Sequence, residues 1–261
     1  MRELGKVYLI GAGPGAADLI TVRGARLLAQ ADVVLYDALV TPEMLALCAQ
    51  AELISVGKRS GQRSTAQEAI NRLLVECAQQ YRMVVRLKGG DPMLFGRADE
   101  ELRALEALGI DVEIVPGITT AVAAAAAARQ PLTKRGVARS VAFFTSSTAP
   151  DQPEHPALPH TDTMIQYMGG REAAATAERL LAQGRSTDTP VVVVENCSRP
   201  DERIERLTLA DLARGLDPAH GPVLVMIGEA LRLREHQADN AAAPRACTPF
   251  PDGRTVQSGS S

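Results

Sequence analysis

Short β-rich runs alternate with helix-like stretches through the first 115 residues, and this alternation constrains the fold more than any other feature. The runs lie at 7–10, 32–37, 53–56, 84–87 and 112–115. Helices are expected between them, at about 19–30, from Thr41 onward, from the pair Ser64 and Gln67 onward, and at 99–108. Strands that are separated by helices pair in parallel, because antiparallel neighbours need only a short turn. The sequence therefore predicts a five-stranded, mostly parallel sheet with helices on both faces.

The pattern of β-like and helix-like runs changes at Pro116-Gly117, where the second half begins. Its β-like runs lie at 140–145, 164–167, 190–195, 203–207 and 223–227, with helical patterns only at 171–183 and about 209–216. Because several runs lack an intervening helix, a mixed sheet is expected here. The α/β chain is thus predicted to form two α/β domains, at residues 1–116 and 117–235. The stretch 236–261 is rich in Ala, Pro, Gly and Ser and is predicted to be a disordered tail.

Composition and charge exclude several classes of partner. The chain has 261 residues, of which 46% are apolar and 23% charged, as in ordinary globular proteins. A formal net charge of -3, the absence of Trp and a total of four Phe and four Tyr argue against a nucleic-acid surface. The longest apolar run, 121–128, is too short to cross a bilayer, and no signal-peptide pattern is visible. We therefore expect no nucleic-acid or membrane partner and a cytoplasmic location.

The reactive residue types form none of the usual catalytic or metal-binding patterns. The cysteines are scattered without a CxxC pair, at Cys48, Cys77, Cys197 and Cys247, and the four histidines form no HExxH. This spacing predicts neither a disulfide framework nor a metal site. No Ser/His/Asp grouping, P-loop or pair of catalytic carboxylates is present, so covalent hydrolysis and phosphoryl transfer are disfavoured.

The first glycine-rich loop, 11–15, allows two interpretations. It follows a strand, and Asp37 ends the next strand, which formally satisfies a dinucleotide-binding pattern. However, Pro14 removes a backbone N–H where a pyrophosphate needs donors, and the next helix begins late, after Asp18. A tight turn and a ligand-binding loop are equally compatible with this motif alone.

The loop 88–97 points more clearly to a ligand. Gly89-Gly90 would let a ligand lie against the backbone, Asp91 could accept a hydrogen bond from a ribose or an amine, and Arg97 could bind a carboxylate. Charged groups at the carboxyl ends of parallel strands usually serve a site. Three of the four lysines also lie in loops beside glycine, at Lys58, Lys88 and Lys134. We therefore predict a binding site at this edge of the sheet.

The second half adds candidates whose roles the pattern leaves open. Thr119 and Thr120 precede an alanine-rich helical run, where their hydroxyls could cap the helix or hold a ligand. Met168 stands at a strand end beside two glycines and could be core or line an apolar pocket. Cys197 is expected to be a small packing residue, since nothing in its sequence neighbourhood would activate a thiolate.

Taken in this order, the motifs resemble those of the tetrapyrrole methyltransferases that use S-adenosylmethionine. The matching segments are 7–15, 31–40, 56–59, 84–97, 115–119, 131–136, 167–169 and 194–196, which lie between residue 5 and about 234. Tyr36-Asp37, Gly57-Lys58-Arg59 and the segment 87–92 are most similar to the branch of the family that methylates uroporphyrinogen III. Each motif by itself is a modest indication of this family, whereas the whole set in this order is specific to it.

The resemblance implies a tetrapyrrole methylase fold and a homodimer, with the methyl donor S-adenosyl-L-methionine bound between two domains, S-adenosyl-L-homocysteine as product, a tetrapyrrole as substrate and no metal. By position, it implies Asp37 as proton acceptor, Lys58 as proton donor, and Arg97 and Arg135 as ligands of substrate carboxylates. The donor site implied in the same way consists of Pro14, Gly89, Gly90, Asp91, Leu94, Thr119, Thr120, Met168 and Cys197.

Departures from the family pattern concentrate on the acceptor side. The family usually has Arg where Ala38 stands and His at Lys134, together with a His in the loop around Gln62 and a Gly-His pair near Ser147. Cys197 replaces the small residue that is usual there. Three alternatives therefore stay open: a methyltransferase acting on another tetrapyrrole or on the protein or RNA targets of distant relatives, a non-catalytic relative that binds donor or tetrapyrrole, and a nicotinamide oxidoreductase.

Overall fold

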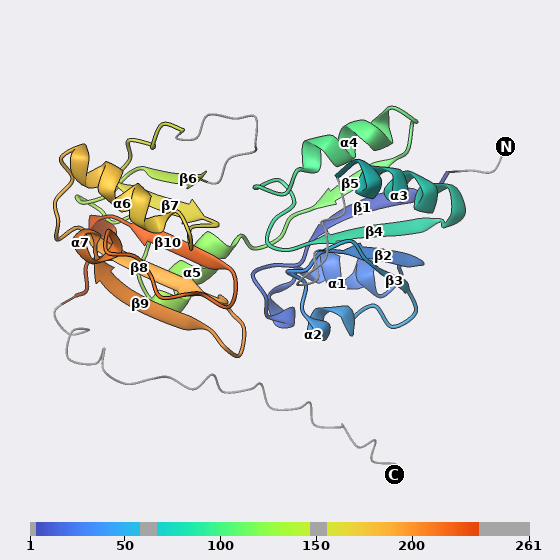
Figure 1. Cartoon of the computed structure of the whole chain (residues 1–261). Coiled ribbons are helices and arrows are strands. Elements are labelled where there is room, and N and C mark those ends of the chain that lie inside the picture. The colour runs from blue at the N-terminus through green and yellow to red at the C-terminus, as the bar shows by residue number, and fades with distance from the viewer. Residues whose placement is uncertain (1–3, 58–66, 147–155, 235–261) are drawn as a thin grey trace, which may run out of the picture.

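Two five-stranded sheets lie side by side in the protein, each with its own helices (Figure 1). The structure is a computed structural model that describes residues 4–57, 67–146 and 156–234. The sheets fall on either side of Pro116, as expected from the sequence, and the division into two domains at this point stays a prediction. Ser64 and the stretch 236–261 lie outside the described residues. No helix within the described ranges is both long and apolar enough to cross a membrane.

The first sheet is entirely parallel, which confirms the prediction from its helix-separated strands. Its strands are β1 (Lys6–Gly11), β2 (Val33–Tyr36), β3 (Glu52–Ser55), β4 (Met83–Lys88) and β5 (Val112–Val115), in the order β3-β2-β4-β1-β5. Because all five run in one direction, their carboxyl ends and the loops that follow lie along one edge. That edge faces the second sheet (Figure 1).

Successive residues of these strands serve two separate cores, one on each face of the sheet. Leu9 packs with helices α3 (Gln67–Gln80) and α4 (Ala98–Glu106), whereas the next residue, Ile10, packs with α1 (Val22–Leu28) and α2 (Pro42–Leu45). This alternation follows from the two-residue period of a strand. Both faces are therefore covered, as the near-continuous apolar runs indicate.

The predicted helix at 19–30 is shorter than expected. The chain first forms a 3₁₀ turn, η1 (Ala17–Leu19), and α1 then begins at Val22, with the Thr21 hydroxyl accepting a hydrogen bond from the Gly24 amide at 3.1 Å. The helix at Thr41 is only one turn long, and the Thr41 hydroxyl donates to the Gly15 carbonyl at 3.1 Å instead of capping it. Helical spacing of apolar residues does not report such local competition for hydrogen bonds.

The second sheet is mixed, as predicted. Its strands are β6 (Val141–Thr145), β7 (Thr163–Tyr167), β8 (Pro190–Glu195), β9 (Arg203–Thr208) and β10 (Val223–Ile227), in the order β6-β7-β10-β8-β9. Only β6 and β7 pair in parallel. Helix α5 (Thr120–Ala128) covers one face, and α6 (Ala173–Ala182) and α7 (Leu209–Leu212) cover the other, while η2 (Glu229–Leu231) follows β10.

Three glycines allow the first sheet to meet the segment that leads to α5. A Cβ on Gly117 would lie 2.2 Å from the Gly90 carbonyl oxygen, and a Cβ on Gly11 would lie 2.5 Å from the Gly117 Cα. Gly90 and Gly13 exchange backbone hydrogen bonds of 2.7 and 3.1 Å beside this contact. The ends of β1, β4 and β5 are therefore in direct backbone contact, and no side chain fits at Gly11 or Gly117.

Replacing Gly117 with alanine should destabilise the protein by about 2 kcal/mol or more, because the added methyl group forces two backbone segments apart. Gly170→Ala is the matched control, since its Cβ would meet only the Val223 side chain at 3.4 Å, an ordinary contact distance. Urea unfolding of both variants measures the difference. Equal stability of the two variants would contradict the close approach.

Candidate functional site

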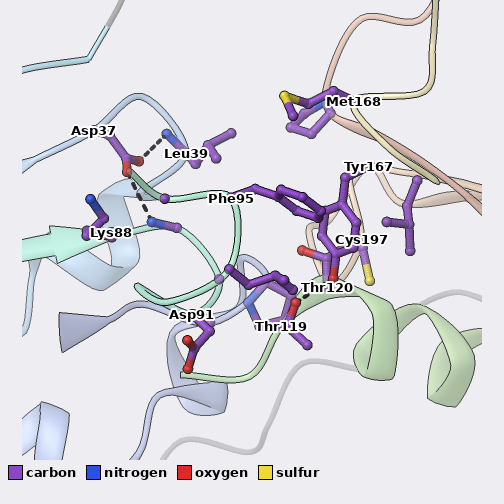
Figure 2. A pocket seen from close by; sticks show the side chains of 18 of the residues that line it. Asp37, Leu39, Lys88, Asp91, Phe95, Thr119, Thr120, Tyr167, Met168 and Cys197 are labelled. Atoms are coloured by element: carbon purple, nitrogen blue, oxygen red, sulfur yellow. Dashed lines mark hydrogen bonds between the residues drawn. The ribbon is translucent and has the colours of Figure 1, made fainter. Parts of the chain in front are cut away.

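A cavity of about 370 Å³ lies between the two sheets and is lined by residues of both. The first half contributes mainly the loops that follow β1, β2 and β4, and the second half contributes the start of α5, the carboxyl ends of β7 and β8 and the start of β10. Figure 2 shows side chains from both halves converging on this space. A cavity at the carboxyl edge of a parallel sheet is the usual place for a ligand in such folds.

The loop after β4 forms one wall of the cavity and is held rigidly by Asp91. Its Oδ1 accepts a hydrogen bond from the Met93 amide at 2.8 Å, and its Oδ2 accepts one from the Gly117 amide at 2.9 Å. Gly90 has a φ of +69°, and a Cβ built on it would meet nothing within 4 Å. The Asp91 carboxylate therefore ties this loop to the segment before α5, and Gly90 leaves open space beside the backbone.

Asp37 is placed at the cavity by the end of β2 and oriented by two backbone amides. Its Oδ1 accepts from the Leu39 amide at 2.9 Å, and its Oδ2 accepts from the Gly89 amide at 3.1 Å (Figure 2). The side chain is half-buried and lines the cavity. A carboxylate held by two N–H groups has a defined orientation, which suits a group that must receive a proton at one place.

A buried charge cluster lies behind the loop after β4. Arg86 and Lys88 alternate with Leu87 along β4, so both reach the face that α4 covers, where Glu101 is fully buried. The Arg86 Nε donates to the Glu101 Oε1 at 3.0 Å, and the Lys88 Nζ donates to its Oε2 at 2.6 Å. Burial lowers the pKa of Lys88, against the opposing effect of Glu101. Glu101 is thus the single carboxylate that these two cavity-lining cations share.

Aromatic side chains join the two halves at the cavity. The Tyr167 ring lies 5.1 Å from the Phe95 ring, which belongs to the loop after β4, and 6.1 Å from the Phe143 ring of β6. The Tyr167 hydroxyl also hydrogen-bonds the Thr119 hydroxyl (Figure 2). It accepts a further hydrogen bond from the Ala121 amide at 3.1 Å. Burial raises the pKa of Tyr167, so its hydroxyl remains protonated. The Thr119 hydroxyl therefore bonds Tyr167 and does not cap α5.

Met168 and Cys197 line the same cavity in different ways. Met168 has a φ of +56°, is 54% exposed and turns its thioether toward the cavity (Figure 2). Cys197 is buried, and this burial raises the pKa of its thiol to about 12. The thiol is therefore neutral at physiological pH and cannot serve as a nucleophile, in agreement with its expected role in packing.

Most of the side chains singled out in the sequence meet at this one cavity. These are Pro14, Asp37, Gly89, Gly90, Asp91, Leu94, Arg97, Thr119, Thr120, Met168 and Cys197. Arg135 is exposed and is not among the lining residues, and Lys58 lies outside the described residues. In the part of the chain that the structure describes, no group of His, Cys, Asp or Glu side chains is arranged to hold a metal ion.

Several lining residues were not among the predicted site residues. Besides Lys88, which was singled out only among the lysines, they are Gly13, Leu39, Gln67, Arg86, Phe95, Gly96, Tyr167, Asn196, Arg199, Pro222 and the first two residues of β10, Val223 and Leu224. Tyr167 and Phe95 could have been found, because each is an aromatic residue inside a motif that was already singled out. Arg199 has no such signal, since nothing in the sequence places it near Asp37.

Comparison with known proteins agrees with this geometry. Residues 6–213 match the family model described as Tetrapyrrole (Corrin/Porphyrin) Methylases. Siroheme synthase 2 of Yersinia pestis (strain Pestoides F) is 48% identical over 240 residues, which are 90% of this chain and 51% of that protein. Siroheme synthase of Pseudomonas fluorescens (strain SBW25) is 45% identical over 88% of this chain and 51% of its own length. The chain thus spans about half the length of the curated relatives it matches.

Two solved structures resemble the whole of the described fold. Uroporphyrin-III C-methyl transferase from Thermus thermophilus, complexed with S-adenosyl homocysteine, has a TM-score of 0.77 and 38% identity, covering 87% of this chain and 94% of that one. A cobalt precorrin-4 methyltransferase from cobalamin biosynthesis has a TM-score of 0.74 and 33% identity, covering 87% of this chain and 96% of that one.

Replacing Glu101 with glutamine should cost about 3–5 kcal/mol of stability at neutral pH, because two buried cations lose their shared carboxylate. The loss should shrink at higher pH, since the lowered pKa of Lys88 lets its amine become neutral and cheaper to bury. Chemical denaturation across a pH series measures both effects. The control is Glu106→Gln, an exposed position at the end of α4. A Glu101→Gln variant as stable as this control would contradict the role of the cluster.

Proposed function

Because the chain belongs to the tetrapyrrole methylase family, we propose that it transfers methyl groups from S-adenosyl-L-methionine to uroporphyrinogen III. Methylation at carbons 2 and 7 of the macrocycle would give precorrin-2, on the way to sirohaem or cobalamin. The observation that carries the proposal is the cavity between the sheets. It brings a glycine-lined wall, two threonine hydroxyls and an oriented carboxylate to one place.

The lining of the cavity fits an S-adenosyl donor better than a nucleoside diphosphate. Gly89 and Gly90 let a ligand lie against the backbone, and Leu94 and Met168 supply apolar surface. Pro14 has no amide proton, and α1 begins only at Val22, so a phosphate would find few donors in the first loop. A donor of this class has no phosphate and carries a sulfonium cation. In this proposal Asp91, Thr119, Thr120 and Cys197 complete the donor site.

The proposed chemistry needs little from the protein beyond positioning and one base. The bound donor supplies an electrophilic methyl carbon, so no enzyme nucleophile is required, which is compatible with the neutral Cys197 thiol. The lining side chains hold the reacting atoms about 3–3.5 Å apart and exclude water. Carbons 2 and 7 already carry side chains, so the proton that leaves after methylation comes from another position of the macrocycle, and Asp37 receives it, either directly or through a water that it orients. Lys58 is the proposed proton donor.

The substrate carries eight carboxylates, which arginine side chains at the cavity mouth would bind. Arg97 is exposed and forms two 2.7 Å hydrogen bonds with Glu100, which raises the pKa of Arg97 and keeps it charged. Arg135 is proposed as a second ligand, outside the cavity itself. A homodimer and a cytoplasmic location belong to the same proposal, and sedimentation analysis tests the dimer.

A second acceptor class is favoured by one comparison. The likeness to the cobalt precorrin-4 methyltransferase is nearly as strong as that to the uroporphyrin-III enzyme. A corrin-type tetrapyrrole is therefore the alternative substrate. An acceptor screen with the labelled donor distinguishes the two.

The proposal is tested by incubating the purified chain with methyl-labelled S-adenosylmethionine and uroporphyrinogen III without oxygen. We expect label in a dimethylated product with the absorption of a precorrin. If label enters only a corrin-type acceptor, the alternative is correct. If no tetrapyrrole is labelled, the proposed function is wrong.

Replacing Asp37 with asparagine should slow turnover by about 10²-fold or more, because the amide cannot accept the proton. The affinity for S-adenosylhomocysteine, measured by calorimetry, should stay nearly unchanged, since the donor site is retained. Asp217→Asn, at an exposed position outside the cavity, controls for the loss of a carboxylate. Turnover equal to that of the wild type would remove Asp37 from the mechanism.

A further inference from the structure

The positively charged side chains that line the cavity differ in how they are neutralised. Arg86 and Lys88 share Glu101, and Arg97 is paired with Glu100. Arg199 also lines the cavity, yet it forms no ion pair with any carboxylate of residues 4–57, 67–146 and 156–234. Within the described lining, its charge alone is not offset by a neighbouring carboxylate.

Arg199 is presented by a tight turn that follows β8. The Arg199 amide donates to the Asn196 carbonyl at 3.0 Å, and the Ser198 amide donates to the Glu202 carboxylate at 2.6 Å. Asn196 and Ser198 both adopt left-handed backbone conformations, with φ values of +51° and +60°. Such conformations cost free energy and persist where surrounding bonds hold them. The turn is therefore a rigid support for the arginine.

The same turn is docked against the first half of the protein. The Ala16 amide donates to the Ser198 hydroxyl at 3.0 Å, and a Cβ on Gly15 would lie 2.8 Å from the Arg199 Cγ. The absence of a side chain at Gly15 thus makes room for the stem of Arg199. A guanidinium from the second half is thereby fixed over the loops of the first.

The guanidinium reaches the loop that holds Asp37. Its Nη2 donates to the Leu39 carbonyl at 2.9 Å, while the Leu39 amide donates to the Asp37 carboxylate at 2.9 Å. Arg199 therefore bonds the carbonyl group of Leu39, and Asp37 bonds the amide group of the same residue. The loop itself, Asp37-Ala38-Leu39-Val40, contains no cation. An arginine has five N–H donors, so the bond to Leu39 leaves others for a ligand.

We propose that Arg199 binds a peripheral carboxylate of the tetrapyrrole and so positions the ring against Asp37. This inference rests on the proposed function. A guanidinium pairs with a carboxylate through two parallel hydrogen bonds, which fixes orientation as well as distance. Anchoring one carboxylate beside Leu39 places the macrocycle next to the group that takes its proton. Arg199 is thus a substrate-positioning residue supplied by the second half of the chain.

The test compares Arg199→Gln, Arg199→Lys and the wild type for binding of uroporphyrin III, the stable oxidised octacarboxylate, by fluorescence quenching. Removing the charge should weaken uroporphyrin binding about fivefold or more, a limited loss because a half-buried ion pair is partly screened. Lysine should restore part of the affinity, because it keeps the charge but not the planar guanidinium. The KM for uroporphyrinogen III should rise more than kcat falls. Arg72→Gln removes the same charge at an exposed position of α3 outside the cavity and should change neither quantity.

A purely structural clamp gives a different result. If Arg199 only joined the two halves, Arg199→Gln would lower the melting temperature and would weaken the binding of S-adenosylhomocysteine and of uroporphyrin to the same extent. Lysine would then restore neither affinity. That pattern, or unchanged uroporphyrin binding in a folded Arg199→Gln variant, would overturn the inference. Arg199-dependent uroporphyrin binding without any methyl transfer by the wild type would support the inference and overturn the proposed function instead.

Discussion

The contact of bare backbone at Gly11, Gly90 and Gly117 is the constraint on which the site depends. The ends of β1, β4 and β5 approach so closely there that a Cβ fits at neither Gly11 nor Gly117, each of which would meet backbone atoms within 3 Å. The Asp91 carboxylate reinforces the contact by accepting a hydrogen bond from the Gly117 amide. As a result, the loops after three parallel strands and the segment that enters α5 border a single cavity. Without this close approach, residues of the two sheets would not line one common cavity.

Charge is distributed unevenly around this cavity, with paired cations deep in its wall and accessible ones nearer its mouth. Deep in the wall, Glu101 offsets the charges of Arg86 and Lys88, and all three side chains are buried. Nearer the mouth, Arg97 and Arg199 remain accessible to a ligand. The net charge of -3 therefore says little about the binding of carboxylates, because recognition is local.

Most of the strands could be predicted from the sequence, and the helices less well. Buried strands such as β8 and β10 are uniform apolar runs, so their bounds are visible directly. Helix α1 was predicted too long, because η1 and the Thr21 cap depend on hydrogen bonds that a periodic pattern does not reveal. Glycine and charge at the strand ends pointed to Gly89, Gly90, Asp91 and Arg97 as candidates, whereas Pro14, Leu94 and the role of Asp37 were taken from the resemblance to the family. Arg135 was also taken from the resemblance, and it lies outside the cavity.

The sequence by itself determined the alternation of strands and helices, the parallel first sheet, and the loops that carry Asp37, Asp91 and Thr119. These are properties of neighbouring residues, which periodicity and turn chemistry report directly. Only the tertiary structure decided that Tyr167 forms a hydrogen bond with Thr119 and that Arg199 forms one with the Leu39 carbonyl, in the loop of Asp37. Those contacts join residues 48 and 160 positions apart. They depend on how two independently patterned sheets pack against each other, and no local pattern encodes that packing.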